Sequence, residues 1–123
     1  MSDKDPTRAI TDIDMAKLAQ AIEHFRTFDK EIPAQVIATF LYVASHDDCS
    51  KVDLEKALAF SSASGSRNTD WLSAFHRLNK PGLGLIIKYR DPNNRRRQVL
   101  QLSPKGRKLV QELKEILYPE ELK

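Results

Sequence analysis

Apolar residues repeat with helical spacing along most of this chain. From about residue 11 to residue 29, Met15, Leu18, Ile22 and Phe25 recur at steps of three and four residues, which is the repeat of one helix face. This stripe predicts a long N-terminal helix. Two roles stay open for its apolar face: packing into the core of its own domain, or packing against a second copy of the chain.

Two further helices are expected before residue 60. Pro33 suits a first-turn position, and the strongly apolar residues that follow it predict a core helix. These apolar residues are Ile37, Leu41 and Ala44, flanked by Val36 and Phe40. Ser50 is a candidate N-cap with Asp53 three residues later, which predicts a short helix of about ten residues.

The segment SSASGSRNTDWLSAFHRL, from residue 61, restarts a helix with Ser61 as its candidate cap. Gly65, Thr69 and Leu72, continued by Phe75, are spaced to face inward, and the glycine allows a close approach to a neighbouring helix. The opposite side then carries small hydroxyls and one long cation. This pattern fits both an ordinary solvated helix start and a contact surface, and it does not choose between them.

Two strands and a final helix complete the pattern. LIIKYR (85–90) and RQVLQL (97–102) carry β-branched or aromatic residues, which are typical of strands, and DPNNRR between them carries turn signals. Ser103 is then expected to cap a helix that opens at Pro104. The order helix, helix, helix, helix, hairpin, helix predicts a mainly α fold with a small β-hairpin: a winged helix-turn-helix with flanking N- and C-terminal helices.

The composition fits one small domain. The chain has 123 residues, 41% of them hydrophobic, which is enough for one compact core. Residues 1–10 are expected to be a flexible leader, and 11–123 a single winged-helix domain. No apolar run approaches the roughly 20 residues of a membrane span, and the polar N-terminus does not fit a signal peptide. We therefore expect a soluble, cytoplasmic protein.

Positive charge is concentrated in one part of the sequence. Residues 88–108 hold eight basic residues and one acid, a local excess of +7 in a chain whose net charge is only +3. The rest of the chain is therefore acidic on balance. Such segregation is expected to concentrate positive potential on one side of a small protein, as attraction of a polyanion requires.

The basic stretch strongly resembles the wing and following helix of MarR-type winged helix-turn-helix transcriptional regulators. The wing of that family reads Asp-Pro-x-Asp-Arg-Arg, then an apolar strand, then Leu-Thr/Ser-x-x-Gly. The matching positions here are Asp91, Pro92, Asn94, Arg95, Arg96, Leu102, Ser103 and Gly106. Upstream, LAFSSASGSRN resembles the family pattern Leu-Gly-Leu-Ser-x-x-x-x-Ser-Arg, so the match covers roughly residues 33–117.

The resemblance implies a homodimeric transcriptional repressor that binds double-stranded DNA, with its recognition helix in the major groove and its wing in the minor groove. It implies a dimerisation helix at 11–29, a DNA-binding unit at 33–102 with the wing at 85–102, and a C-terminal helix at 103–118. The implied DNA-contacting residues are Ser62, Ser64, Ser66, Arg67, Asn68, Lys88, Arg95, Arg96 and Arg97. Because side chains alternate along a strand, the last three cannot all face DNA, and Arg95 is the foremost candidate.

The sequence departs from the family pattern in three places. Asn94 replaces the usual wing aspartate, which predicts a more mobile and more positive loop. The connection SAFHRLNKPGLGL, from residue 73, is longer than usual and resembles that of a small subgroup of phage-encoded winged-helix proteins. Only about twenty residues follow the wing, so a dimer is expected to depend mainly on residues 11–29.

No phosphate-binding loop, metal-ligand spacing or catalytic triad is recognisable, so neither an enzyme nor a cofactor or metal is expected. His24, His46 and His76 are widely separated, and Cys49 is expected to be a buried spacer rather than an oxidant sensor. Small-molecule effectors are common in the resembled family, but no cluster in this sequence identifies one.

Two other functions remain as alternatives. The winged helix could be a protein-interaction module, for example a phage factor that binds a host protein. Binding of single-stranded nucleic acid is less favoured, because Tyr89 is the one aromatic residue near the basic hairpin and such binding uses several aromatic side chains for stacking.

Overall fold

A computed structural model describes residues 9–74 and 80–119. In these ranges the chain forms five helices and a three-stranded antiparallel sheet. The elements are α1 (Ile13–Arg26), α2 (Ala34–Ser45), β1 (Cys49–Ser50), α3 (Lys51–Leu58), α4 (Ser62–Leu72), β2 (Ile86–Asp91), β3 (Asn94–Leu102) and α5 (Pro104–Leu117). The predicted fold class and helix order are confirmed. Most of the expected leader, and Phe75, lie outside the described residues.

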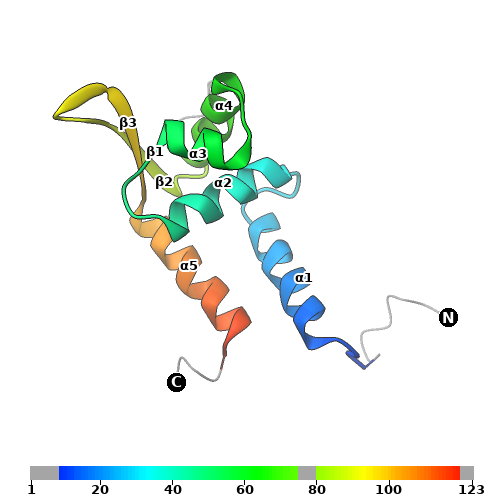
Figure 1. The fold of residues 1–123 in the computed structure, drawn as a ribbon. Coiled ribbons are helices and arrows are strands. Elements are labelled where there is room, and N and C mark those ends of the chain that lie inside the picture. The colour runs from blue at the N-terminus through cyan, green and yellow to red at the C-terminus, as the bar shows by residue number, and fades with distance from the viewer. Residues whose placement is uncertain (1–8, 75–79, 120–123) are drawn as a thin grey trace.

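The elements divide into an upper and a lower part in the view of Figure 1. α4 and the tip of the β2–β3 hairpin, the wing, lie at the upper edge, with α3 and α2 beneath α4. α1 and α5 extend from this unit toward the opposite end. They are tied together by the Lys17 ammonium, which donates to the Leu117 carbonyl at 2.8 Å.

Serine caps start the helices where the sequence predicts them. Ser50 Oγ accepts from the Asp53 amide at 3.0 Å, and Ser61 Oγ accepts from the Ser64 amide at 3.1 Å. Ser103 caps α5 in the same way. Each hydroxyl satisfies an amide that has no partner within the first turn of its helix, so these three boundaries follow from local chemistry.

α2 is a core helix, as predicted. Val36, Thr39, Phe40 and Val43 are buried, whereas Leu41 is 46% exposed. Ile37 and Ala44 pack against the core. Leu41 is the exception in the predicted apolar set, because the apolar residues of this helix extend around it beyond the face that packs on the core. The packing of Phe25 from α1 edge-on against Phe40, with ring centroids 5.7 Å apart, shows the orientation that is adopted.

The sheet has one strand more than the predicted hairpin and a shorter turn. β1 pairs with β3, with Cys49 opposite Leu100 and Ser50 opposite Val99, which gives the order β1-β3-β2. Asp91 pairs with Asn94 across the hairpin, so the turn is two residues long rather than the predicted DPNNRR. The arginines at 95 and 96 therefore belong to strand β3.

Residues 82–85, the described end of the connection before the wing, are hydrogen-bonded to the end of α4 and the residues after it. The Leu83 amide donates to the Trp71 carbonyl at 2.9 Å, and the Leu85 amide donates to the Leu72 carbonyl at 2.7 Å. Leu85 is completely buried. These bonds lead the chain from the end of α4 into β2. Among the described residues, no helix has the length and hydropathy needed to cross a membrane.

Candidate nucleic-acid interface

The exposed side of α4 is the first part of the candidate interface. Gly65, Thr69 and Leu72 are buried as predicted. Ser62 and Arg67 are exposed, and Ser64 and Ser66 are partly exposed. Arg67 Nη2 donates to Ser64 Oγ at 3.0 Å. The first two turns of α4 therefore present hydroxyls and one guanidinium to solvent.

Asn68 does not lie on this exposed side, which corrects the sequence-based assignment. Its side chain is 6% exposed, and its Nδ2 donates to Gln35 Oε1 on α2 at 3.2 Å. The physical reason is helical spacing: Asn68 comes three residues after the inward Gly65, and residues three apart share a helix face. Asn68 joins α4 to α2.

Lys88 is also engaged inside the protein. Its ammonium forms an ion pair with the Asp70 carboxylate of α4, and the two side chains are only 17% and 23% exposed. The assignment of Lys88 as a DNA contact is therefore not supported. Its position on β2 opposite the end of α4 makes it a link between the wing and that helix.

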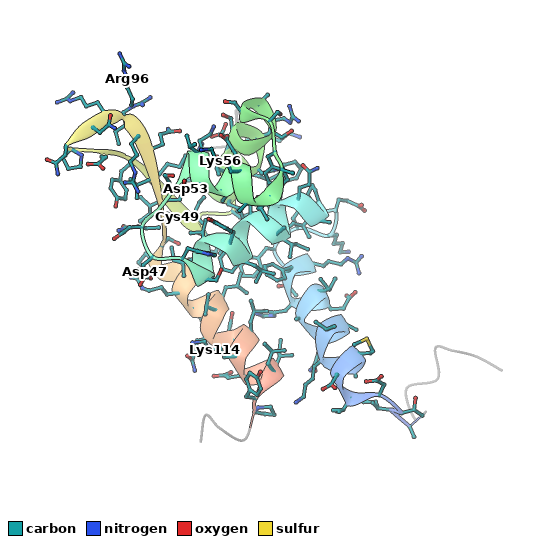
Figure 2. All side chains as sticks on the ribbon, in the orientation of Figure 1. Asp47, Cys49, Asp53, Lys56, Arg96 and Lys114 are labelled. Carbon is teal, nitrogen blue, oxygen red and sulfur yellow. The ribbon has the colours of Figure 1, made fainter. Side chains whose placement is uncertain are left out.

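The wing arginines are not equivalent. Arg95 and Arg96 are exposed, and Figure 2 shows Arg96 pointing away from the wing tip. Arg97 is paired with Asp91 at 3.1 Å and is partly buried. Arg90, which sequence reasoning did not include, is exposed, and its Nη1 donates to the Arg95 carbonyl at 3.0 Å. The hairpin register places Arg90 beside the turn, and this position is the signal that makes it a further candidate for DNA contact.

Asn94 is bonded within the wing despite replacing an acid. Its Oδ1 accepts from the Arg96 amide at 3.2 Å. The acid at the start of the turn, Asp91, accepts from the Asn93 amide at 2.8 Å and also holds Arg97. Asp91 therefore supplies a carboxylate partner for a wing arginine, although Asn94 replaces the usual wing aspartate.

The basic segment divides between two places in the structure. Lys105 donates to the Leu83 carbonyl at 2.8 Å and lies over the Phe28 ring, while Arg107 donates to the Leu102 carbonyl at 3.2 Å. Both are at the start of α5, below the wing. The basic residues of the segment therefore lie on two elements, the wing and the start of α5, and Lys105 and Arg107 are exposed. Concentration of the charge on one side of the protein stays a prediction.

Cys49 is buried, and the two described histidines, His24 and His46, contact neighbouring side chains. Cys49 is 7% exposed, and burial raises the pKa of its thiol, as expected for a spacer rather than a reactive thiolate. His24 Nε2 lies 3.0 Å from Glu112 Oε1 on α5, and His46 stacks on Tyr42. His76 lies outside the described residues. Within 9–74 and 80–119, no group of His, Cys, Asp and Glu is arranged to hold a metal ion.

The apolar stripe of α1 is mostly uncovered. Phe25 is buried, but Met15, Leu18 and Ile22 are 55%, 53% and 45% exposed. Ile13, at the start of the helix, is 58% exposed. Of the two roles left open by the sequence, packing within its own domain accounts only for the C-terminal end of this stripe.

No protein-family model and no curated protein sequence matches the chain. Solved structures do match it. The Staphylococcus aureus MepR–DNA complex is 25% identical, with a TM-score of 0.69 over 89% of this chain and 82% of MepR.

Two more distant structures share the fold, each at 17% identity. A mutant of Escherichia coli MarR in complex with operator DNA has a TM-score of 0.62 over 88% of this chain and 70% of its own. A MarR transcriptional regulator from Methanosarcina mazei has a TM-score of 0.63 over 87% and 70%. This set of regulators agrees with the prediction that the protein is not an enzyme. The resemblance seen in the wing sequence is confirmed, and the chain has the fold of the MarR-type winged helix-turn-helix regulators.

Proposed function

We propose that this protein is a transcriptional regulator that binds double-stranded DNA as a homodimer, most simply as a repressor. The observation that carries the proposal is the common edge of α4 and the wing. α4 lies at the same edge of the molecule as the wing tip (Figure 1), and Figure 2 shows Arg96 projecting from that tip. Ser62 and Arg67 on α4 and Arg95 on the wing are also exposed. A duplex laid along this edge meets both elements at once.

In this arrangement α4 enters the major groove, which is wide enough for a helix. Ser62 is placed to donate to a phosphate, and Ser64 and Ser66 to phosphates or base edges. Arg67 is the one long cation exposed on the described turns of α4. A guanidinium at that place binds guanine with two hydrogen bonds or clamps the backbone.

The wing reaches the flanking minor groove through Arg95 and Arg96. A narrow, A·T-rich minor groove has an enhanced negative potential that attracts guanidinium groups. Arg97 is paired with Asp91 and therefore stabilises the hairpin rather than contacting DNA. The solved complexes of MepR and MarR with DNA support this general placement, because they share the fold.

The exposed apolar face of α1 is proposed to pack against a second copy. Burial of Met15, Leu18 and Ile22 removes large apolar side chains from water, at roughly 25 cal/mol per Å² of surface buried. A twofold dimer presents two copies of α4 to one face of a duplex. The two half-sites are then expected about 10 base pairs apart, one turn of DNA, or a multiple of that.

Selection of bound duplexes from a random-sequence pool tests the proposal. We expect enrichment of an inverted repeat whose half-sites have the spacing of one or two DNA turns. A reporter promoter overlapping the enriched site should then be less active when the protein is present. A selection that enriches no duplex, together with co-purification of a host protein, would support the protein-interaction module instead.

A further inference from the structure

α4 lies against α3 with almost no space between them at Gly65. A Cβ atom placed on Gly65 would lie 2.1 Å from Glu55 Oε2, 2.6 Å from its Cγ and 2.7 Å from its Cδ. Contacts this short do not occur in folded proteins. Any larger residue at position 65 therefore requires either the Glu55 side chain or α4 itself to move.

Glu55 is held in place by an ion pair. Lys51 Nζ donates to Glu55 Oε2 one turn away on α3, and the two side chains are only 11% and 13% exposed. The same ammonium lies 3.4 Å from the Ser62 carbonyl in the first turn of α4. The pair thus contacts α4 at two points, beneath Gly65 and at Ser62.

Stability alone does not account for a buried ion pair at this place. Removing two charges from water costs about as much as their attraction returns, and apolar residues of similar volume often stabilise a fold equally well. An ion pair does impose one defined geometry on the groups around it. α4 needs such contacts, because its first turns consist of serines and a glycine, which are weak helix formers.

We propose that Lys51 and Glu55 are positioning residues that set the place of α4 on α3, and that duplex affinity depends on this pair through Gly65. The exposed Ser62 and Arg67 belong to the same two turns of α4. A displacement at Gly65 therefore moves them relative to the wing. The inference rests on the proposed function, since DNA affinity is its main readout.

A double-mutant cycle tests the proposal in the full-length protein, with Gly65→Ala, Glu55→Ala and the two combined. Gly65→Ala is expected to weaken binding of the selected duplex about tenfold, the equivalent of one well-placed contact. The melting temperature of this variant should not fall along with its DNA affinity, because alanine favours a helix more than glycine does. Adding Glu55→Ala removes the obstacle, and affinity should return most of the way toward that of Glu55→Ala alone.

Two results would overturn the proposal. One is a Gly65→Ala protein that binds as tightly as wild type. The other is a combined variant that binds about tenfold more weakly than Glu55→Ala alone, because the defect caused by Gly65→Ala would then not pass through Glu55. If Glu55→Ala fails to fold with Lys51 left unpaired, the pair Lys51→Met/Glu55→Ala takes its place in the cycle.

Backbone amide chemical shifts of the DNA-free proteins separate failure of this inference from failure of the proposed function. Gly65→Ala should shift amides throughout 61–68 of the wild-type protein, and the same substitution should shift them less when it is made in the Glu55→Ala protein. If the wild-type protein binds no duplex, the proposed function fails while these shifts still test the positioning of α4. Equal shifts in both variants would contradict the role of Glu55.

Discussion

In the unit formed by α2, α3, α4 and the sheet, Phe40, Leu54 and Leu72 are fully buried, and the exposed residues of α4 and the wing tip are mainly serines and arginines. On α1, by contrast, the large apolar side chains face solvent: Met15, Leu18 and Ile22 are each about half exposed. Single exposed apolar residues such as Leu41 are normal on protein surfaces, whereas a stripe along one helix is not.

On the proposal that α1 packs against a second copy, this difference separates a part of the molecule that is complete within one chain from a part that assembly completes. The upper unit supplies most of the hydrophobic core, to which α1 adds Phe25 and α5 adds Leu109 and Leu113. It also has its own caps and its own ion pairs between elements. α1 has a buried end at Phe25 and an apolar remainder in solvent. We therefore expect changes on α1 to act through assembly, and changes in the upper unit to act through local geometry or direct contact.

The largest effect is expected from Leu18→Glu/Ile22→Glu. Two carboxylates on the exposed stripe should prevent burial against a second copy, so the dimer should become a monomer in sedimentation experiments. Affinity for the inverted repeat should then fall on the order of a hundredfold, because two linked sites become two separate ones.

The matched control for this variant is Thr11→Glu/Gln20→Glu, which adds the same charge at exposed polar positions in or next to α1. It should remain dimeric. A Leu18→Glu/Ile22→Glu protein that sediments like wild type would show that the stripe is not the dimer interface. The expectation that changes on α1 act through assembly would then be wrong.

An intermediate effect is expected from Lys88→Met in the upper unit. The change removes the ammonium that joins β2 to Asp70 of α4, and should lower the free energy of unfolding by about 1.5–3 kcal/mol, as for a lost hydrogen bond to a charged group. Arg90→Met, an exposed cation on the same strand, is the control and should leave stability nearly unchanged. Urea unfolding distinguishes the two. Equal stability of both variants would return Lys88 to the candidates for direct DNA contact.

The smallest effect concerns Cys49. Because burial raises the pKa of this thiol, the neutral form is favoured in the folded protein. Its contribution to stability is full below the ordinary thiol pKa and is lost as the pH rises toward the raised value. Alkylation at pH 8 should therefore be slow in the native protein and fast in urea. Native alkylation at the unfolded rate would instead mark Cys49 as accessible and reactive.

Sequence reasoning was most successful where local chemistry decides the outcome. Ser50, Ser61 and Ser103 cap their helices as predicted, because a cap involves only residues of the first turn. The inward set Gly65, Thr69 and Leu72 was also predicted, since only one face of α4 carries residues that pack well.

The errors arose where a long-range contact decides. The apolar residues of α2 extend around it beyond the face that packs on the core, and contacts with α1 and α4 decide that Leu41 stays exposed. β1 is only two residues long and forms because it pairs with β3. No local sequence pattern predicts this pairing. Asn68 and Lys88 are polar residues whose partners, Gln35 and Asp70, are 33 and 18 residues away in the chain. The Lys51–Glu55 pair has ordinary i, i+4 helix spacing in the sequence, and only the tertiary fold brings Gly65 against it.

The measurement that tests the central claim most directly is the salt dependence of duplex binding by Arg95→Ala/Arg96→Ala. Lys108→Ala/Lys114→Ala is the matched control, because it removes the same charge from exposed positions on α5, where Figure 2 shows Lys114 far from the wing. We predict that the wing variant binds more weakly and that the slope of log affinity against log salt falls by about two, whereas the control keeps the wild-type slope. Identical slopes for the wing variant and the wild type would contradict the claim that the wing contacts DNA.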